Sequence, residues 1–282
     1  MPVLVTGAEC ALGRAAIAAL LSSGGEVRAY LDPLVAPDGA VERLRAAGCK
    51  AARGTLDDEG FLESAMEQVH TVVHTATDVL TAPDEVLDDA ASVLSAAVSA
   101  GVRRLVLISH LGVAEASGNA WLEAVAEAEE LCVDSPLDTV VIRRALSYGP
   151  QDGLTAALVD GAAGVAPDST HAPLFLSDLG GAVVAADDRD RADGALPHLV
   201  VPLGGPDLTS LGELIAMLGG QVTGGYGGAP SRARSPLLPD HAIDLHSRDL
   251  VPDRALPSAG TPLRTGTALV RDAFGSGPPG EG

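Results

Sequence analysis

The chain has 282 residues, a formal net charge of −20, 46 % hydrophobic residues and only 2 % aromatic residues. This length fits one large α/β domain, or a nucleotide-binding core with a smaller C-terminal lobe, and the core must be built mainly from aliphatic side chains. The acidity argues against a nucleic-acid or anionic-membrane surface, because both need a basic footprint.

Short apolar segments alternate with helix-length segments through the first 150 residues. Strands are predicted at 3–7, 26–31, 49–54, 71–77, 103–110 and 137–144. Helices are predicted between them at 11–22, 38–48, 58–69, 84–101 and 119–132. The strands are continuously apolar, which is typical of a parallel sheet covered by helices on both faces. Right-handed crossovers then give an α/β fold with a doubly wound parallel sheet, the Rossmann fold.

After residue 150 this rhythm weakens, and we expect a small C-terminal α/β lobe. A strand followed by a helix is predicted at 174–188, and a further strand at 196–204. A helix is predicted at 208–220, with Thr209 as its N-cap. The Gly, Pro and Arg content of residues 223–262 predicts loops.

The last residues complete the predicted domain organisation. A short helix is expected at 261–274 and a disordered tail at 275–282. The Rossmann core is assigned to residues 1–150, and the lobe that interleaves with it to residues 151–274.

The cysteines and the N-terminus bear on compartment and metal binding. Cys10, Cys49 and Cys132 have neither CxxC nor metal-ligand spacing, so no metal site is expected. The first residues lack the basic region of a signal peptide, and the apolar run that follows is too short to span a bilayer. We therefore expect a reduced protein of the cytoplasm.

A glycine-containing turn, "VTGAECALGRAA", joins the first strand to the first helix. Gly7 and Gly13 occupy the outer places of a GxxGxxG pattern, and Cys10 stands at the middle one. Such a turn lets the backbone approach a pyrophosphate at a helix N-terminus. Cys10 places a β-carbon where the backbone would approach the pyrophosphate most closely, so the turn is expected to bind phosphate less tightly. The alternative is a strand-to-helix turn that binds no ligand.

The end of the second strand, "YLDP", carries Asp32. An acid at this place accepts hydrogen bonds from both ribose hydroxyls of a dinucleotide and repels a 2′-phosphate, which favours NAD over NADP. The alternative interpretation of Asp32 is a turn residue before Pro33.

Six segments together resemble the atypical and extended short-chain dehydrogenase/reductases, in their NmrA-like and epimerase-like branch. The likeness covers roughly residues 1–220, and its segments are "VTGAECALGR", "EVRAYLDP", "GTLDDEGFLESAMEQVHTVVHTAT", "SAGVRRLVLISHLGV", "NAWLEAVAEAEEL" and "LDTVVIRRALSYGP".

The resemblance implies a set of cofactor contacts. The pyrophosphate would lie against Gly7, Ala8, Leu12 and Gly13. Leu56 would pack on the adenine, with Asp57 beside it. Thr75 and Ala76 would flank the adenine-side ribose and the phosphates, and Ser109 would face the nicotinamide. Asp57 is also a candidate N-cap of the helix that follows it.

The family's catalytic pair, Tyr-x-x-x-Lys on one helix face, is missing. Its two places fall on Trp121 and Val125, and neither side chain can transfer a proton near neutral pH. The single lysine, Lys50, follows none of the three tyrosines at the required spacing. Trp121 is interpreted as core filling, with stacking on a flat substrate as the alternative.

Other candidate groups for chemistry are few. His110 ends a central strand and is the candidate general acid or base, with Ser109 beside it and Glu123 as a group that would orient it or face water. His74 is interpreted as a core histidine. Trp121 and Tyr148 are assigned to the substrate cleft, with His171 and Asp178 at its border.

The sequence therefore predicts an NAD(P)-binding protein of this superfamily. The first hypothesis is an oxidoreductase or epimerase-type enzyme with non-standard catalysis on a small organic substrate. The alternative is a non-catalytic sensor or regulatory protein, and a scaffold without cofactor is the third. The resemblance also allows a homodimer in which helices 84–101 and 119–132 pair as a four-helix bundle.

Overall fold

The structure is a computed structural model of the chain. It describes residues 2–75, 77–115, 118–149, 151–161, 164–189, 198–220 and 238–252. The helix expected at 261–274 and the tail at 275–282 lie outside these ranges.

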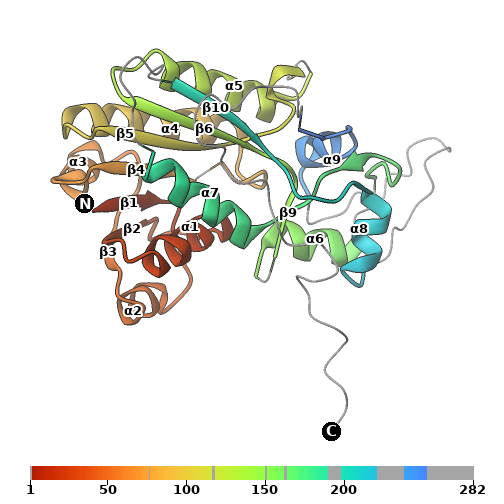
Figure 1. Cartoon of the computed structure of the whole chain (residues 1–282), viewed down its shortest axis with the longest axis horizontal. Coiled ribbons are helices and arrows are strands. Elements are labelled where there is room, and N and C mark those ends of the chain that lie inside the picture. The colour runs from red at the N-terminus through yellow and green to blue at the C-terminus, as the bar shows by residue number, and fades with distance from the viewer. Residues whose placement is uncertain are drawn as a thin grey trace, which may run out of the picture.

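A seven-stranded sheet forms the centre of the molecule, in the order β10-β6-β5-β4-β1-β2-β3 (Figure 1). Its strands are β1 Val3–Thr6, β2 Val27–Leu31, β3 Lys50–Arg53, β4 Thr71–His74, β5 Arg104–His110, β6 Asp138–Arg144 and β10 His198–Leu203. Every neighbouring pair is parallel. The doubly wound parallel sheet predicted from the sequence is therefore confirmed, with its order reversing between β1 and β4.

Helices cover both faces of this sheet, as continuous apolar strands require. One face packs on α1 Ala11–Ser22, α2 Ala40–Ala46 and α7 Leu176–Asp187. The other packs on α3 Glu59–Met66, α4 Pro83–Ser99 and α5 Ala120–Val133. Alternation along β5 sends Val106 and Ile108 to the first core, and Leu105 and Leu107 to the second.

The second half of the chain forms a lobe at one end of the molecule (Figure 1). Its elements are β7 Ser147–Tyr148, α6 Gly153–Gly161, β8 Thr170–His171, β9 Leu174–Phe175, β11 Thr209–Ser210, α8 Leu211–Met217 and α9 Asp240–His246. A third apolar cluster joins this lobe to Trp121 and Val125 at the start of α5, just after the short 3-10 helix Val113–Glu115. The lobe thus shares a core with the Rossmann unit, while β10 adds to the main sheet.

Three local expectations were wrong. The N-cap of α8 is Ser210, because its hydroxyl and the Glu213 carboxylate form a reciprocal capping box, whereas Thr209 lies in β11. The N-cap of α3 is Asp58, which accepts from the backbone N–H of Phe61, so Asp57 does not cap this helix. The segment predicted as loops contains α9.

The described residues include no helix that is long and apolar enough to cross a membrane.

The contact between α1 and α7 depends on a glycine. A β-carbon added at Gly180 would lie 2.6 Å from the carbonyl oxygen of Ala15 and 2.8 Å from the β-carbon of Ala19, while one added at Gly181 would meet nothing within 4 Å. We expect Gly180→Ala to lower the free energy of unfolding by about 1–3 kcal/mol through overpacking. The matched control Gly181→Ala should raise it by up to about 1 kcal/mol through helix propensity. Urea denaturation measures both, and equal effects would contradict this account of the contact.

Candidate dinucleotide site

A cavity of about 470 Å³ opens where β1 and β2 end, beside the glycine turn. Its wall is formed by Gly7, Glu9, Cys10, Ala11, Arg14, Tyr30, Asp32, Val35, Leu56, Asp78, Leu80, Thr81, Glu85, Asp89, Gln151 and Gly153. This is the point where the strand order reverses, which is where open α/β sheets place their ligands.

The turn has the tight geometry that the glycine pattern predicts. Gly7 adopts a φ of 69°, and a β-carbon at Gly13 would lie 2.2 Å from the carbonyl oxygen of Gly7. Cys10 is the N-cap of α1, and its sulfur accepts a hydrogen bond from the Gly13 N–H at 3.3 Å. The thiol therefore accepts from one of the N–H groups that have no partner within the first turn of α1. Ala8 and Leu12 are buried behind the turn and do not line the cavity.

The other expected cofactor residues divide between the cavity and the core. Asp32 lines the cavity and also accepts from the Leu34 N–H at 2.7 Å, so the ligand and turn interpretations are compatible. Leu56 lines the cavity, whereas Asp57 is exposed and lies outside its wall. The Thr75 hydroxyl donates to the carbonyl oxygen of Thr6 at 2.6 Å and so ties β4 to β1. Ala76 is not among the described residues.

Apart from Asp32, sequence reasoning missed the charged groups of this cavity. Among the residues that the structure describes, Arg14 is the only basic one in its wall, and its guanidinium donates to the carbonyl oxygens of Glu9 and Gln151, the latter at 2.7 Å. The position of Arg14 directly after Gly13 is the feature of the sequence from which its place in the wall could have been predicted. The five acidic side chains come from separate segments and are Glu9, Asp32, Asp78, Glu85 and Asp89.

Burial changes the protonation of two of these acids and of the neighbouring thiol. Burial, followed by the charges of Glu85 and Asp32, raises the pKa of Asp89 to about 7. Burial also raises the pKa of Glu9, and it raises that of the Cys10 thiol to about 11. Cys10 is therefore a neutral thiol at physiological pH and not a nucleophile.

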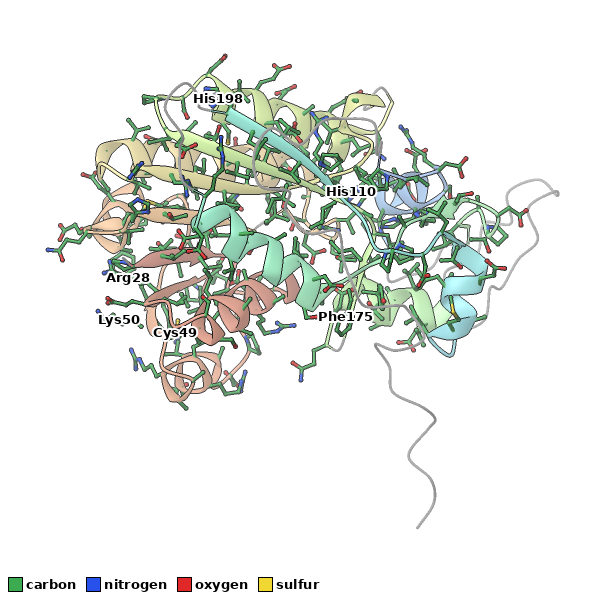
Figure 2. All side chains as sticks on the ribbon, viewed as in Figure 1. Arg28, Cys49, Lys50, His110, Phe175 and His198 are labelled. Atoms are coloured by element: carbon green, nitrogen blue, oxygen red, sulfur yellow. The ribbon has the colours of Figure 1, made fainter. Side chains whose placement is uncertain are left out.

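The two candidate catalytic residues are held by contacts outside the cavity. Ser109 donates its hydroxyl proton to Glu129 on α5, and Glu129 also accepts from Arg143 at 2.6 Å. His110 is fully buried, with its ring edge-on to Trp121 at 5.8 Å and its Nδ1 2.7 Å from the carbonyl oxygen of Leu111. Figure 2 labels His110 where β5 runs toward α9. Neither side chain lines the cavity.

The residues expected in a substrate cleft are also covered. Trp121 and Tyr148 are both 0 % exposed, so neither faces an open cleft here. His241 of α9 lies parallel to the indole of Trp121, with 6.4 Å between ring centres. This placement agrees with core filling, and the lobe occupies the space in which a flat substrate would stack. Val125 is buried beside Trp121 in the same cluster.

The remaining candidate site residues lie outside the wall of the cavity. Glu123 is exposed and accepts from the Gly118 N–H. His171 is buried, and Asp178 is partly buried in the first turn of α7. His74 is a core histidine whose Nδ1 lies 2.8 Å from the Thr6 hydroxyl. In the described ranges, no cluster of three or more His, Cys, Asp or Glu is arranged to hold a metal ion.

The sheet order, the glycine turn and the cavity at the reversal point define a dinucleotide-binding protein of the Rossmann type. The chain belongs to the NAD(P)H-binding family, whose model matches residues 7–162. This membership confirms the superfamily resemblance and the class of cofactor, a nicotinamide dinucleotide, while the preference for NAD stays a prediction. No curated protein matches the sequence.

Solved structures share this fold across nearly the whole chain. UDP-glucose 4-epimerase from Bifidobacterium longum, in complex with NAD+ and UDP, has a TM-score of 0.73 at 18 % identity, covering 97 % of this chain and 96 % of that one. MoeE5 with UDP-glucuronic acid and NAD has a TM-score of 0.72 at 20 % identity and the same coverage. The NADPH-dependent quinone oxidoreductase QOR2 of Escherichia coli, complexed with NADPH, has a TM-score of 0.68 at 19 % identity, covering 96 % of this chain and 98 % of that one.

Proposed function

We propose that this protein binds a nicotinamide dinucleotide as a regulatory ligand, without using it for hydride transfer. One contrast supports this proposal. The cavity at the glycine turn is open, whereas Trp121 and His110, at the positions where the chemistry would take place, are fully buried beneath the lobe. A side chain without solvent contact can exchange no proton with a substrate unless the lobe moves.

NAD is the form that the wall of the cavity favours. Five carboxylates and one guanidinium face this space, so a further phosphate dianion on the ribose would be repelled. Asp32 lies at the end of β2, where it can accept from the ribose hydroxyls. Arg14 would contact the pyrophosphate near the N-terminus of α1.

A second candidate is an oxidoreductase or epimerase-type enzyme acting on a small organic substrate. The observation in its favour is the shared fold with NAD-dependent epimerases and a quinone oxidoreductase. In this case α9 would have to leave the end of β5 so that His110 could act as the general acid. Homodimer formation and a cytoplasmic location stay part of the proposal.

Calorimetric titration with NAD+, NADH, NADP+ and NADPH tests the proposal. We expect a micromolar site for NAD+ or NADH that is lost in Gly13→Ala, because the new β-carbon would collide with Gly7. Gly60→Ala is the matched control, since a β-carbon there meets nothing within 4 Å. Circular dichroism confirms that each variant is folded. No binding of any dinucleotide would overturn the proposal, and turnover of the bound cofactor with a quinone or a sugar nucleotide would favour the enzyme.

The acidic wall predicts a pH dependence of this binding. An anionic ligand stabilises protonated Asp89, whose pKa is about 7 in the free protein, so binding takes up a proton. Affinity should therefore rise as the pH falls toward about 7, by up to about tenfold per pH unit for one proton, and level off below it. Asp89→Asn should remove this dependence, while Asp88→Asn, on the exposed side of α4, should keep it. The same slope in both variants would contradict the role of Asp89.

A further inference from the structure

A group of buried polar atoms without hydrogen-bond partners lies where β5 and β6 end, beneath α9. Within the described part of the chain, the unpartnered atoms are Nε2 of His110, Nε1 of Trp121, Nε of Arg144, Nδ1 of His171 and both ring nitrogens of His246. Each of these five residues is at most 1 % exposed. Folded proteins satisfy nearly all such atoms, so a group of them in one place needs an explanation.

These side chains surround one ring. The centre of the His246 ring lies 5.9 Å from that of His110 and 6.2 Å from that of His171. Trp121 touches His110 from the side, at 5.8 Å. Arg144 is the cross-strand partner of His110, and its carbonyl oxygen accepts from the Leu111 N–H at 2.8 Å. Side chains from four elements, β5, α5, β6 and β8, thus lie around the end of α9 that carries His246.

The hydrogen bonds of two histidines fix which atoms donate and which accept. A carbonyl oxygen can only accept, so His110 donates from Nδ1 to Leu111 and its Nε2 carries a lone pair. Nε2 of His171 lies 3.1 Å from the carbonyl oxygen of His246 and 3.0 Å from the Ser169 hydroxyl. Because that hydroxyl donates its proton to the same carbonyl oxygen, Nε2 of His171 carries the ring proton and Nδ1 the lone pair. Burial lowers the pKa of both rings, which keeps them neutral. Trp121 and Arg144 can only donate.

Arg144 adds a charge that needs a partner. Its guanidinium donates to the Ser147 hydroxyl at 3.2 Å and to the carbonyl oxygen of Ala145 at 3.4 Å. Among the described residues it forms no ion pair, although it is 1 % exposed. Asp78 and Asp152 act on it only from a distance. Because an isolated buried charge is costly, the environment of Arg144 is suited to an anion.

We propose that His110, Trp121, Arg144 and His171 form a binding site for a small hydroxycarboxylate, and that His246 fills this site when no ligand is bound. The carboxylate would accept from the Arg144 and Trp121 N–H groups. The ligand's hydroxyl would donate to the lone pair of His110 or His171. His246 is a poor occupant, because neither of its nitrogens finds a partner. The site is distinct from the glycine-turn cavity and does not require dinucleotide binding.

α9 is held by the apolar side chains of Ala242 and Leu245, both 0 % exposed, and by a few hydrogen bonds. Asn119 donates its amide to the carbonyl oxygen of His241 at 3.0 Å and to the Asp244 carboxylate at 2.8 Å. The Ser169 hydroxyl donates to the carbonyl oxygen of His246 at 2.8 Å. These hydrogen bonds can be exchanged for water when a ligand replaces His246. The helix is only seven residues long.

Trp121 provides the readout, because it is the only tryptophan in the chain and gives a single indole N–H resonance. We expect glycolate to shift this resonance saturably in the dinucleotide-free protein. Acetate, which lacks the hydroxyl donor, should bind more weakly, and chloride at equal ionic strength should cause no saturable shift. A chloride response equal to that of glycolate would overturn the proposal.

Three variants sharpen the test. His246→Ala should tighten glycolate binding by about tenfold or more, because the competing side chain is gone. His74→Asn, which changes a buried histidine outside this site, should leave the affinity unchanged. Arg144→Met should abolish the shift while the remaining spectrum shows a folded protein. If Arg144→Met does not fold, His246→Ala decides, since unchanged affinity in that variant overturns the proposal.

Discussion

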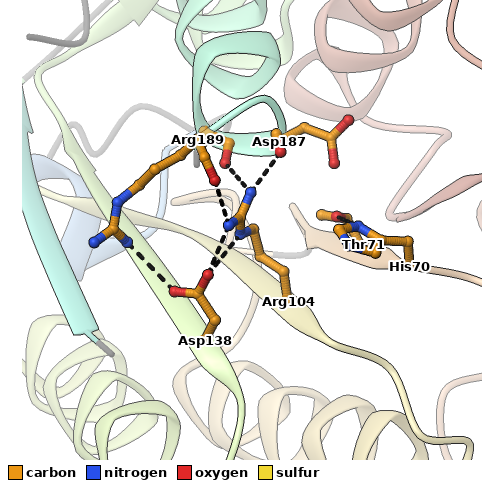
Figure 3. A network of polar contacts seen from close by, with 7 residues as sticks. His70, Thr71, Arg104, Asp138, Asp187 and Arg189 are labelled. Atoms are coloured by element: carbon orange, nitrogen blue, oxygen red, sulfur yellow. Dashed lines mark hydrogen bonds and ion pairs between the residues drawn. The ribbon is translucent and has the colours of Figure 1, made fainter. Parts of the chain in front are cut away.

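Replacing Arg104 by methionine is expected to lower the free energy of unfolding by about 3–5 kcal/mol, because it leaves a buried carboxylate without its main partner. Arg104 and Asp138 begin β5 and β6 and are 2 % and 3 % exposed. Nε and Nη2 of Arg104 lie 3.0 and 2.6 Å from one oxygen of Asp138. Figure 3 shows the same guanidinium reaching the chain at the end of α7.

Arg104 also donates hydrogen bonds to backbone groups, in addition to its ion pair with Asp138. Its guanidinium donates to the carbonyl oxygens of Ala186, at 3.0 Å, and Arg189, at 2.6 Å. The last carbonyl groups of a helix have no partner within the helix, so the arginine satisfies groups that the fold buries. It therefore joins two central strands to α7.

Chemical denaturation of matched variants measures this contribution. Lys50→Met, which breaks the exposed pair with Glu26, should leave stability unchanged because solvent screens such pairs. The double variant Arg104→Met/Asp138→Leu should recover part of the loss, since no unpaired carboxylate remains. A loss in Arg104→Met no larger than in Lys50→Met would contradict the proposed role of the network.

The Rossmann core could be predicted because its signal is local. The strand expected at 103–110 is observed at Arg104–His110, and the helix expected at 119–132 at Ala120–Val133. Continuous apolar strands and capped helices appear in the sequence directly. The helices α6 and α9 were missed, and α9 lies in the segment whose Gly, Pro and Arg content predicts loops.

The site was predictable only where one segment builds it. The glycine turn is such a segment, and the structure has it in the expected form. The acids of the cavity wall come from the glycine turn, from the residue after β2, from the loop after β4 and from α4, so no single motif predicts them. The burial of Trp121 depends on His241, which follows it by 120 positions. Contacts between residues so far apart in the sequence are determined by how the lobe packs against the Rossmann core.

Acidification from pH 7 to pH 5 is expected to lower the free energy of unfolding, because buried neutral histidines must gain protons. Burial lowers the pKa of His74 to about 4 and also lowers those of His110, His171 and His246. Below the unfolded pKa of about 6.5, the unfolded chain binds more protons than the folded one. Stability is therefore fully present above that pH and falls as the pH drops toward the folded pKa.

The size of the effect can be bounded from one residue. For His74, a pKa of about 4 corresponds to about 3 kcal/mol lost between pH 6.5 and 4. Asp89 acts in the opposite direction, since its raised pKa means that the folded state takes up its proton first as the pH falls. Burial also raises the pKa of Glu9 and Asp152, which act in the same direction as Asp89, and it lowers the pKa of a fifth histidine, His70. Five histidines therefore oppose three acids, so the net slope should remain positive with pH.

Denaturation midpoints measured from pH 8 to 5 test this balance. Asp89→Asn should steepen the loss of stability on acidification, because the opposing proton is removed. His74→Asn should reduce the slope by about one proton, since asparagine can still bond to the Thr6 hydroxyl but does not titrate. If wild-type stability rose as the pH fell, relief of repulsion among the acidic groups would outweigh histidine protonation, and the neutral state assigned to the His110, His171 and His246 rings would lose its support.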